Sequence, residues 1–174
     1  MQFNRIYLFI IILLFLTLLY SYYYFSKSAP NFQKLWGRIQ ESKKNIYYGS
    51  IFITLVAFII FLYYLWASNS FIDDKTGIHQ TRKLFVILVI FLLLSISWTP
   101  MSLYYLTNKS TTLKYQIILL MFLIPLSLIY PIYVLYNLQD DKHKLLKNIS
   151  LAGIIYYFLH TFILDGILWC YYFF

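Results

Sequence analysis

The sequence predicts an all-α integral membrane protein, a five-transmembrane-helix bundle that forms a single domain over residues 1–174. Hydrophobic residues make up 61% of the chain and charged residues only 11%, whereas soluble proteins average about 25% charged residues. The 14 basic and 6 acidic residues also leave five windows of 21 to 28 residues that hold at most one charge. About 20 apolar residues cross a bilayer as a helix, so each window is long enough to span it. A water-soluble globular protein is excluded.

Each window is expected to contain one helix, near residues 6–25, 47–67, 84–106, 115–137 and 149–172. The windows are continuously apolar, whereas a membrane strand would alternate over about ten residues. Helices also satisfy their own backbone hydrogen bonds in lipid. For the first window the alternative is a secretory signal cleaved near Ser28-Ala29, but signal cores run to about 15 residues and this window is longer. A retained first helix is therefore predicted.

The net charge of +8 does not indicate nucleic-acid binding, because the basic residues lie at the short ends of apolar helices. An odd number of spans places the two termini on opposite faces of the membrane. Seven basic residues fall on each face, so the positive-inside rule leaves the orientation open. Cys170 is the only cysteine, which excludes an intrachain disulfide, and no Cys/His spacing suggests a metal site.

The segment 26–46 is one of the two longest pieces expected outside the membrane, with 68–83 as the other. It mixes apolar and basic residues, including Pro30, Leu35, Trp36 and Ile39. Trp and Lys/Arg favour the headgroup layer, so one interpretation is an interfacial anchor. The other interpretation is a lid that covers the bundle.

Polar groups inside the predicted spans are informative because lipid cannot satisfy them. Ser95, Thr99 and Ser102 recur at i, i+4 and i+7, so they share one helix face beside Trp98, and this face is expected to point into the bundle. Small hydroxylated residues also mediate helix packing in membranes, so packing and ligand contact are both consistent with this stripe. Pro100 frees a backbone carbonyl at the same place.

Asp165 is the acidic residue within the predicted spans, and His160 precedes it by five residues. In an α-helix this spacing corresponds to roughly 140°, so the two side chains are not expected to share a face. A direct acid–base pair is therefore not predicted, and neither is an enzyme. Asp165 is expected to turn inward, protonated or hydrogen-bonded, and His160 to be neutral and hydrogen-bonded in the bundle.

Four tryptophans, at 36, 66, 98 and 169, stand in recognisable sequence contexts. The second predicted helix begins with Tyr48-Gly49-Ser50-Ile51-Phe52 and ends with Leu62-Tyr63-Tyr64-Leu65-Trp66, the third carries Leu94-Ser95-Ile96-Ser97-Trp98-Thr99-Pro100, and the fifth carries Leu164-Asp165-Gly166-Ile167-Leu168-Trp169. Over residues 30–169 these motifs resemble the translocator protein or tryptophan-rich sensory protein family (TspO/MBR). The family motifs are Phe-Gly-Pro-Val-Trp with Leu-Tyr-x-x-Trp, Leu-Asn-x-x-Trp-(Ser/Pro)-Pro, and Leu-Asn-x-x-x-Trp. The chain departs from them at the two Asn positions, now Ser95 and Asp165, and in the loop, where Pro30-Asn31-Phe32 replaces a longer Pro/Trp motif.

The resemblance implies a five-helix bundle that encloses a pocket for a porphyrin or haem-like molecule or a sterol, closed by the loop between the first two helices, in transport or sensing. The family's pocket positions fall on Phe52, Ser95, Trp98, Tyr157, His160, Thr161 and Leu164, with Trp36 in the lid, and the charged Asp165 is added to this candidate set. Aromatic faces and a few polar groups suit a flat apolar ligand. His160 is a candidate contact for a haem iron. No cofactor is required, and the expected partners are the lipid bilayer, a hydrophobic small molecule and, as a candidate assembly, a homodimer.

Two other classes of function compete with ligand binding. A small aromatic bundle without a soluble domain also fits a structural or assembly subunit of a larger membrane complex. An intramembrane enzyme would need polar catalytic groups that face each other, and His160 and Asp165 are the candidates. An ion channel is less favoured, since no ring of charges or filter-like glycine run occurs.

Overall fold

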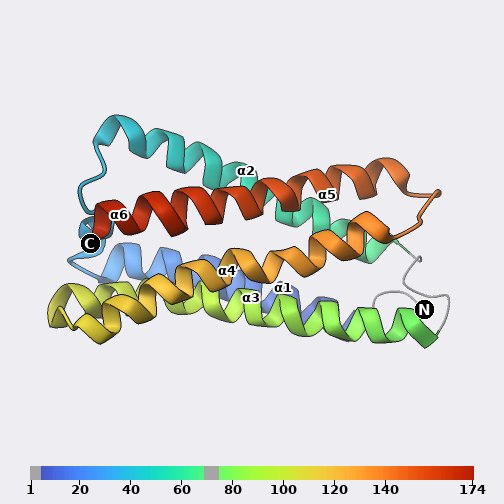
Figure 1. The fold of residues 1–174 in the computed structure, drawn as a ribbon, viewed down its shortest axis with the longest axis horizontal. Coiled ribbons are helices and arrows are strands. Elements are labelled where there is room, and N and C mark those ends of the chain that lie inside the picture. Colours follow the sequence, from blue (N-terminus) through green and yellow to red (C-terminus); the bar gives the residue numbers. More distant parts are fainter. Residues whose placement is uncertain (1–4, 69–74) are drawn as a thin grey trace.

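The computed structural model describes residues 5–68 and 75–174, with the side chains of 75–79 left aside. Every regular element of these residues is helical (Figure 1). In chain order they are α1 (Arg5–Ser28), the 3₁₀-helix η1 (Phe32–Trp36), α2 (Glu41–Ala67), α3 (Lys75–Asn108), α4 (Thr111–Asn137), α5 (Lys144–Leu159), the π-helix η2 (His160–Trp169) and α6 (Cys170–Phe173).

Five helices in the described part of the chain are long and apolar enough to cross a membrane, which confirms the predicted fold class. The last of them joins α5, η2 and α6 into one rod over 144–173. The helices extend beyond the predicted limits, most of all α3, which begins at Lys75 rather than near residue 84. The predicted limits were set where charged residues begin, but a helix can continue through such residues, because Lys, Glu and Gln are good helix formers. Most of the predicted loop 68–83 is thus helical, while residues 69–74 lie outside the described part.

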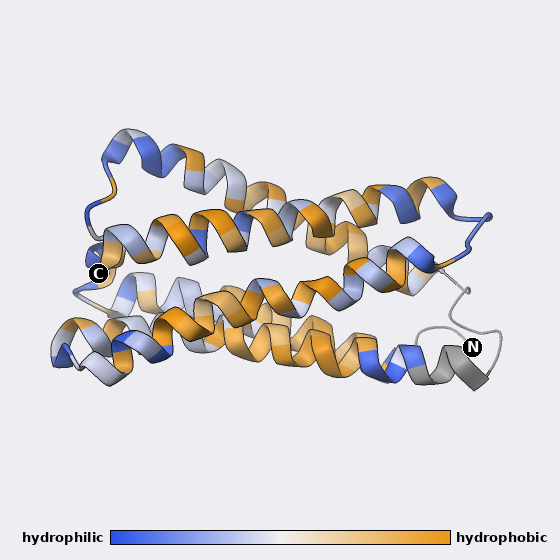
Figure 2. Ribbon diagram, in the orientation of Figure 1, coloured by the Kyte–Doolittle hydropathy of each residue, from blue (hydrophilic) through white to orange (hydrophobic). Residues whose placement is uncertain are grey.

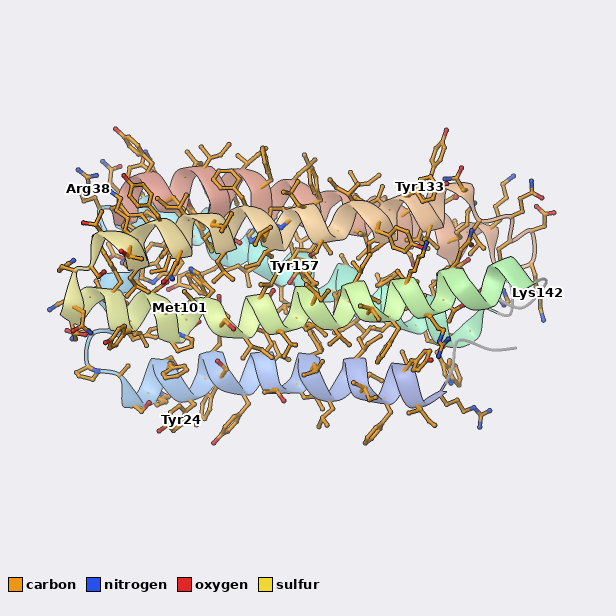
Figure 3. All side chains as sticks on the ribbon, turned by 60° about the horizontal axis from the view of Figure 1, so that its bottom comes forward. Tyr24, Arg38, Met101, Tyr133, Lys142 and Tyr157 are labelled. Carbon is orange, nitrogen blue, oxygen red and sulfur yellow. The ribbon has the colours of Figure 1, made fainter. Side chains whose placement is uncertain are left out.

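The distribution of polarity matches a protein that crosses a membrane. Figure 2 shows hydrophobic residues along the middle of the bundle and hydrophilic residues at both of its ends. The chain enters α1 at one end and finishes α6 at the other (Figure 1). Arg38 and Lys142 mark these opposite ends in Figure 3, while Tyr24 and Tyr133 point outward from the helices. The chain is a multi-pass helical bundle.

The packing order of the helices differs from their order in the sequence. α1 packs on α3, α3 on α4, α4 on α5, and α5 on α2. The first helix is a packed member of the bundle: its buried residues are Leu8, Ile11, Phe15 and Leu18. Phe58 and Phe61 of α2 and Leu88 and Leu92 of α3 are almost completely buried in the shared core.

Candidate functional site

The last span changes its hydrogen-bond pattern within the membrane. Between α5 and α6 the segment His160–Trp169 is a π-helix, in which the i→i+4 pattern of the α-helix becomes i→i+5. Gly166 is buried against α4, and a Cβ at this position would lie 3.3 Å from the Thr161 carbonyl oxygen and 3.5 Å from that of Met121. Gly166 thus packs against the Met121 backbone of α4, while its most crowded neighbour is the Thr161 carbonyl of its own segment. Such π-helical insertions occur frequently at functional sites.

The π-helix brings His160 and Asp165 together. The Nε2 atom of His160 lies 3.4 Å from Oδ2 of Asp165, so the prediction that the two side chains do not share a face is wrong. The angle of 140° assumed α-helical geometry, whereas a π-helix holds more residues per turn, so that residue i+5 comes closer to the face of residue i. The two candidate acid–base groups therefore do not diverge.

The other ring nitrogen of His160 contacts α2. Its Nδ1 atom lies 2.7 Å from the Ser50 hydroxyl, and this hydroxyl lies 2.7 Å from the hydroxyl of Tyr156. Ser50 and His160 are both buried. Tyr156, Ser50, His160 and Asp165 thus form a continuous polar array across the α2–α5 interface. Because both ring nitrogens of His160 already have neighbours, neither is free for the expected contact with a haem iron.

Asp165 faces the interior of the bundle. It interacts electrostatically with Tyr22 of α1, Tyr47 of α2 and Tyr157 of α5. Its side chain keeps 29% of its surface accessible, compared with 3% for His160. The backbone beside it is also engaged, since the Tyr47 hydroxyl donates a hydrogen bond of 3.1 Å to the Leu164 carbonyl. Asp165 therefore lies near side chains of α1, α2 and α5 and stays more accessible than His160.

A face of α3 presents polar atoms to this interior. Thr99 and Ser102 are completely buried, which confirms the predicted inward direction of their stripe. The Trp98 ring lies between Tyr22, with ring centroids 5.5 Å apart, and Trp169, with centroids 5.2 Å apart. Among the described residues, Nε1 of Trp98 and the hydroxyls of Thr99 and Ser102 have no hydrogen-bond partner, although the Tyr22 hydroxyl approaches that of Thr99. The indole N–H of Trp98 and the hydroxyl of Ser102, about one turn apart on α3, thus remain without a partner among the described residues, whereas Thr99 has the Tyr22 hydroxyl nearby.

The remaining residue of the predicted stripe behaves differently. Ser95 is only half-buried, and its hydroxyl donates a hydrogen bond of 2.8 Å to the carbonyl of Phe91 in its own helix. Thr161, also expected in the pocket, is buried and donates to the Tyr157 carbonyl at 2.9 Å. Local bonds therefore satisfy both hydroxyls.

The loop between α1 and α2 is fastened to the C-terminal end of the chain. Nε1 of Trp169 donates a hydrogen bond of 2.8 Å to the Leu35 carbonyl. The backbone N–H of Arg38 donates to the Tyr172 carbonyl at 3.0 Å, and its guanidinium donates to the Tyr171 carbonyl at 3.1 Å. These contacts hold the loop, which we call the lid, against the C-terminal end of the bundle. Trp36 lies in this lid, with its ring edge-on to Tyr47.

Tyr157 and Phe52 have opposite environments. Tyr157 lies between the helices (Figure 3) and meets the rings of Phe58 and Phe91 edge-on. Phe52 is 67% exposed and lines an open apolar groove on the outside of the bundle. The structure therefore does not group Phe52 with the other candidate residues. The buried positions of α2 include Tyr47, Ser50 and Thr54, and a residue two positions from Ser50 points elsewhere.

A second polar cluster lies at the opposite end of the bundle. Asp140 is 5% exposed and accepts hydrogen bonds from the Tyr64 hydroxyl at 3.1 Å, the Ser68 hydroxyl at 2.7 Å and the backbone N–H of His143 at 3.0 Å. It thereby ties the end of α2 to the α4–α5 loop. Sequence reasoning missed this cluster because Asp140 was used only as the charge that ends the fourth apolar window. It also missed Ser50 and Tyr156, although a serine among apolar residues was a usable signal for the first.

Two regions with different chemistry thus meet at Asp165: an aromatic interior with unsatisfied polar atoms, and a hydrogen-bonded array that leads to α2. Comparison of the chain with models of known protein families, with curated proteins and with solved structures finds no match in any of the three.

Proposed function

We propose that this multi-pass membrane protein binds a flat hydrophobic molecule of the porphyrin type inside the bundle, beneath the lid, for transport or sensing as in the TspO/MBR family that its motifs resemble. The observation that supports this most directly is the pair of unsatisfied polar atoms on α3, Nε1 of Trp98 and the hydroxyl of Ser102. More than 90% of buried polar groups in proteins have a partner, and an unmet one costs about 1–3 kcal/mol. A ligand that carries acceptor atoms would supply partners that lipid tails lack.

The surroundings of these atoms suit an aromatic ligand. The rings of Tyr22 and Trp169 flank Trp98, and Phe173 stacks on Trp169 with centroids 4.3 Å apart. Aromatic rings prefer to stack on other flat π-systems or to meet them edge-on. The side chains of Trp98 and Ser102 on α3 would then orient the ligand through its polar edge.

Charge at the same end of the bundle favours an anionic ligand, and so a porphyrin over a sterol. The loops and helix ends there carry one acidic residue, Glu41, and seven basic residues: Lys27, Lys34, Arg38, Lys43, Lys44, Lys109 and Lys114. A surface of one sign attracts ligands of the opposite sign and raises their local concentration. Porphyrins with propionate groups carry this charge, while sterols do not. The rings and hydrogen-bond donors would hold the molecule, because His160 is occupied by Ser50 and Asp165.

The test is titration of the purified protein in detergent with metal-free protoporphyrin IX and, separately, with cholesterol. Trp98→Phe removes the indole N–H and keeps most of the ring. The lost hydrogen bond is expected to weaken porphyrin binding by about 1–2 kcal/mol, roughly a 5- to 30-fold rise in Kd. Trp66→Phe is the matched control, since Trp66 is 56% exposed and belongs to the opposite end of α2. Its affinity should equal that of the wild type.

Each outcome has a defined meaning. An unchanged affinity for Trp98→Phe would remove Trp98 from the site. If well-folded protein binds neither ligand, the assembly-subunit alternative becomes the preferred function. Tighter binding of cholesterol than of protoporphyrin IX would contradict the role assigned to the basic end.

A further inference from the structure

The polar array between α2 and α5 has the arrangement of an activated nucleophile. Oγ of Ser50 lies 2.7 Å from Nδ1 of His160, and Nε2 on the far side of the ring lies 3.4 Å from the Asp165 carboxylate. Nucleophile, base and orienting acid in this order constitute the general pattern of serine-based acyl transfer. With the proton on Nε2, facing Asp165, the Nδ1 lone pair is available to the Ser50 hydroxyl.

The hydroxyl of Ser50 is directed unlike those of three other hydroxylated residues in the spans. Thr17, Ser95 and Ser97 each donate to the carbonyl four residues earlier in their own helix, which is the usual solution in a helix. Ser50 instead meets two side chains of another helix, His160 and Tyr156. A serine in a helix does not need a partner on another helix, whereas an activated serine hydroxyl needs a base such as His160 within hydrogen-bond distance.

An apolar groove on the outside of the α2–α5 interface lies about one helical turn from these hydroxyls. It has a volume of about 320 Å³, and its walls include Ile53 and Ala57 of α2 and Ile149 and Gly153 of α5. Ser50 precedes Ile53 by three residues and Tyr156 follows Gly153 by three, so each hydroxyl lies one helical turn from a wall of the groove. The apolar lining of the groove suits a hydrocarbon chain. The hydroxyls of Ser50 and Tyr156 are the polar groups that lie one helical turn from this lining.

From this geometry we propose that Ser50 is a nucleophile that takes an acyl group from a lipid ester whose chain lies in the α2–α5 groove. The Ser50 oxygen forms a bond to the ester carbonyl carbon while its proton passes to Nδ1 of His160. The bond from this carbon to the ester alkoxy oxygen then breaks, and His160 returns the proton to the departing alcohol. Water or the hydroxyl of a second lipid takes the acyl group from Ser50 by the reverse steps. Tyr156 donates a hydrogen bond within the site, and Asp165 positions His160.

This activity is independent of ligand binding beneath the lid. It uses the lipid-facing side of the α2–α5 interface, whereas the proposed porphyrin site uses the side that faces α3. Failure of either proposal therefore leaves the other standing.

The protein is treated in detergent with a hexadecyl fluorophosphonate. An activated serine oxygen attacks the phosphorus of this probe and displaces fluoride, which leaves a covalent adduct on the serine. Mass spectrometry is expected to find the adduct on Ser50 in the wild type and none there in Ser50→Ala. Loss of the base in His160→Gln should slow labelling by about 100-fold or more. Ser150→Ala is the matched control, because Ser150 is buried in the same interface and lies 3.5 Å from the Ile60 carbonyl. Its labelling rate should equal that of the wild type.

Three further variants keep the test decisive if His160→Gln does not fold. Asp165→Asn should slow labelling and alter the pH profile of the labelling rate. Asp165→Glu should restore part of this rate, because it keeps the carboxylate that positions His160, whereas a purely structural role of Asp165 predicts no such recovery. Ile53→Trp should fill the groove and slow the hexadecyl probe far more than an ethyl fluorophosphonate. Folded wild-type protein that remains unlabelled at Ser50, or labelling that is insensitive to both His160 and Asp165, would overturn the proposal.

Discussion

Replacement of Gly37 by alanine tests whether the lid depends on its fit to the C-terminal helix. Gly37 has φ +53°, and a Cβ added there would lie 2.4 Å from the Tyr172 carbonyl oxygen and 2.7 Å from Cα of Phe173. These are backbone atoms that cannot rotate away, and left-handed backbone costs a non-glycine residue about 1–2 kcal/mol. Gly37→Ala is therefore expected to detach the lid.

The magnitude follows from the bonds that docking makes. Three hydrogen bonds join the lid to the C-terminal segment, from Trp169 to Leu35 and from Arg38 to Tyr171 and Tyr172. At about 1 kcal/mol net for each, their loss shifts the docking equilibrium by about 3 kcal/mol, or about 100-fold. Burial of Leu35, which is 4% exposed, adds to this estimate.

The assay is the rate of tryptic cleavage after Lys34 and Arg38 in detergent, with thermal unfolding measured on the same preparation. Cleavage should be much faster in Gly37→Ala, while the five spans unfold at a similar temperature. Gly49→Ala is the control, because Gly49 lies in α2 with no atom within 4 Å of an added Cβ. Its helix should gain up to about 1 kcal/mol. Equal cleavage rates in Gly37→Ala and the wild type would refute the account of the lid.

Four further predictions concern the bundle itself. Ser102→Ala removes an unsatisfied buried hydroxyl and should raise the stability of the ligand-free protein by about 1 kcal/mol. Asp140→Asn removes the carboxylate that accepts from Tyr64, Ser68 and His143 and should lower the stability by about 2–3 kcal/mol. Both changes are measured as shifts of the denaturation midpoint. Gly153→Ala places a Cβ 2.9 Å from that of Ala57 and should cost about 1–3 kcal/mol, which Ala57→Gly in the same chain should partly restore if the steric reading is correct. Cysteines at positions 109 and 142, in a Cys170→Ser background, should react with an impermeant maleimide from opposite sides of a vesicle, and labelling from one side would contradict the five-span topology.

The sequence predicts the five spans well because a span is set by length and apolarity, which can be read along the chain. The inward direction of Thr99 and Ser102 is equally local, since it follows from helical periodicity. The His160–Asp165 contact is different, because it depends on a π-helix whose close packing against Met121 needs the whole bundle. No periodicity of residues 160–169 distinguishes this segment from an ordinary apolar helix.

Motif likeness alone also misplaced Phe52. It occupies the position of a family pocket residue, yet it is 67% exposed on the outside of the bundle. In a chain with 16 Phe and 19 Tyr an aromatic residue can match a motif by composition alone. The neighbouring Ser50 carried more information, because a polar group in an apolar helix needs a specific partner.

The π-helix makes the number of residues in the last span as important as their identity. Removing one residue between His160 and Trp169 would rotate everything beyond the deletion about the helix axis and draw it back along that axis. Trp169 would then no longer point at the Leu35 carbonyl, and Tyr172 would no longer meet Arg38. Both the catalytic pairing proposed for His160 and the closure of the lid thus depend on the number of residues in the π-helix. Related chains should therefore tolerate substitutions along this segment far better than insertions or deletions.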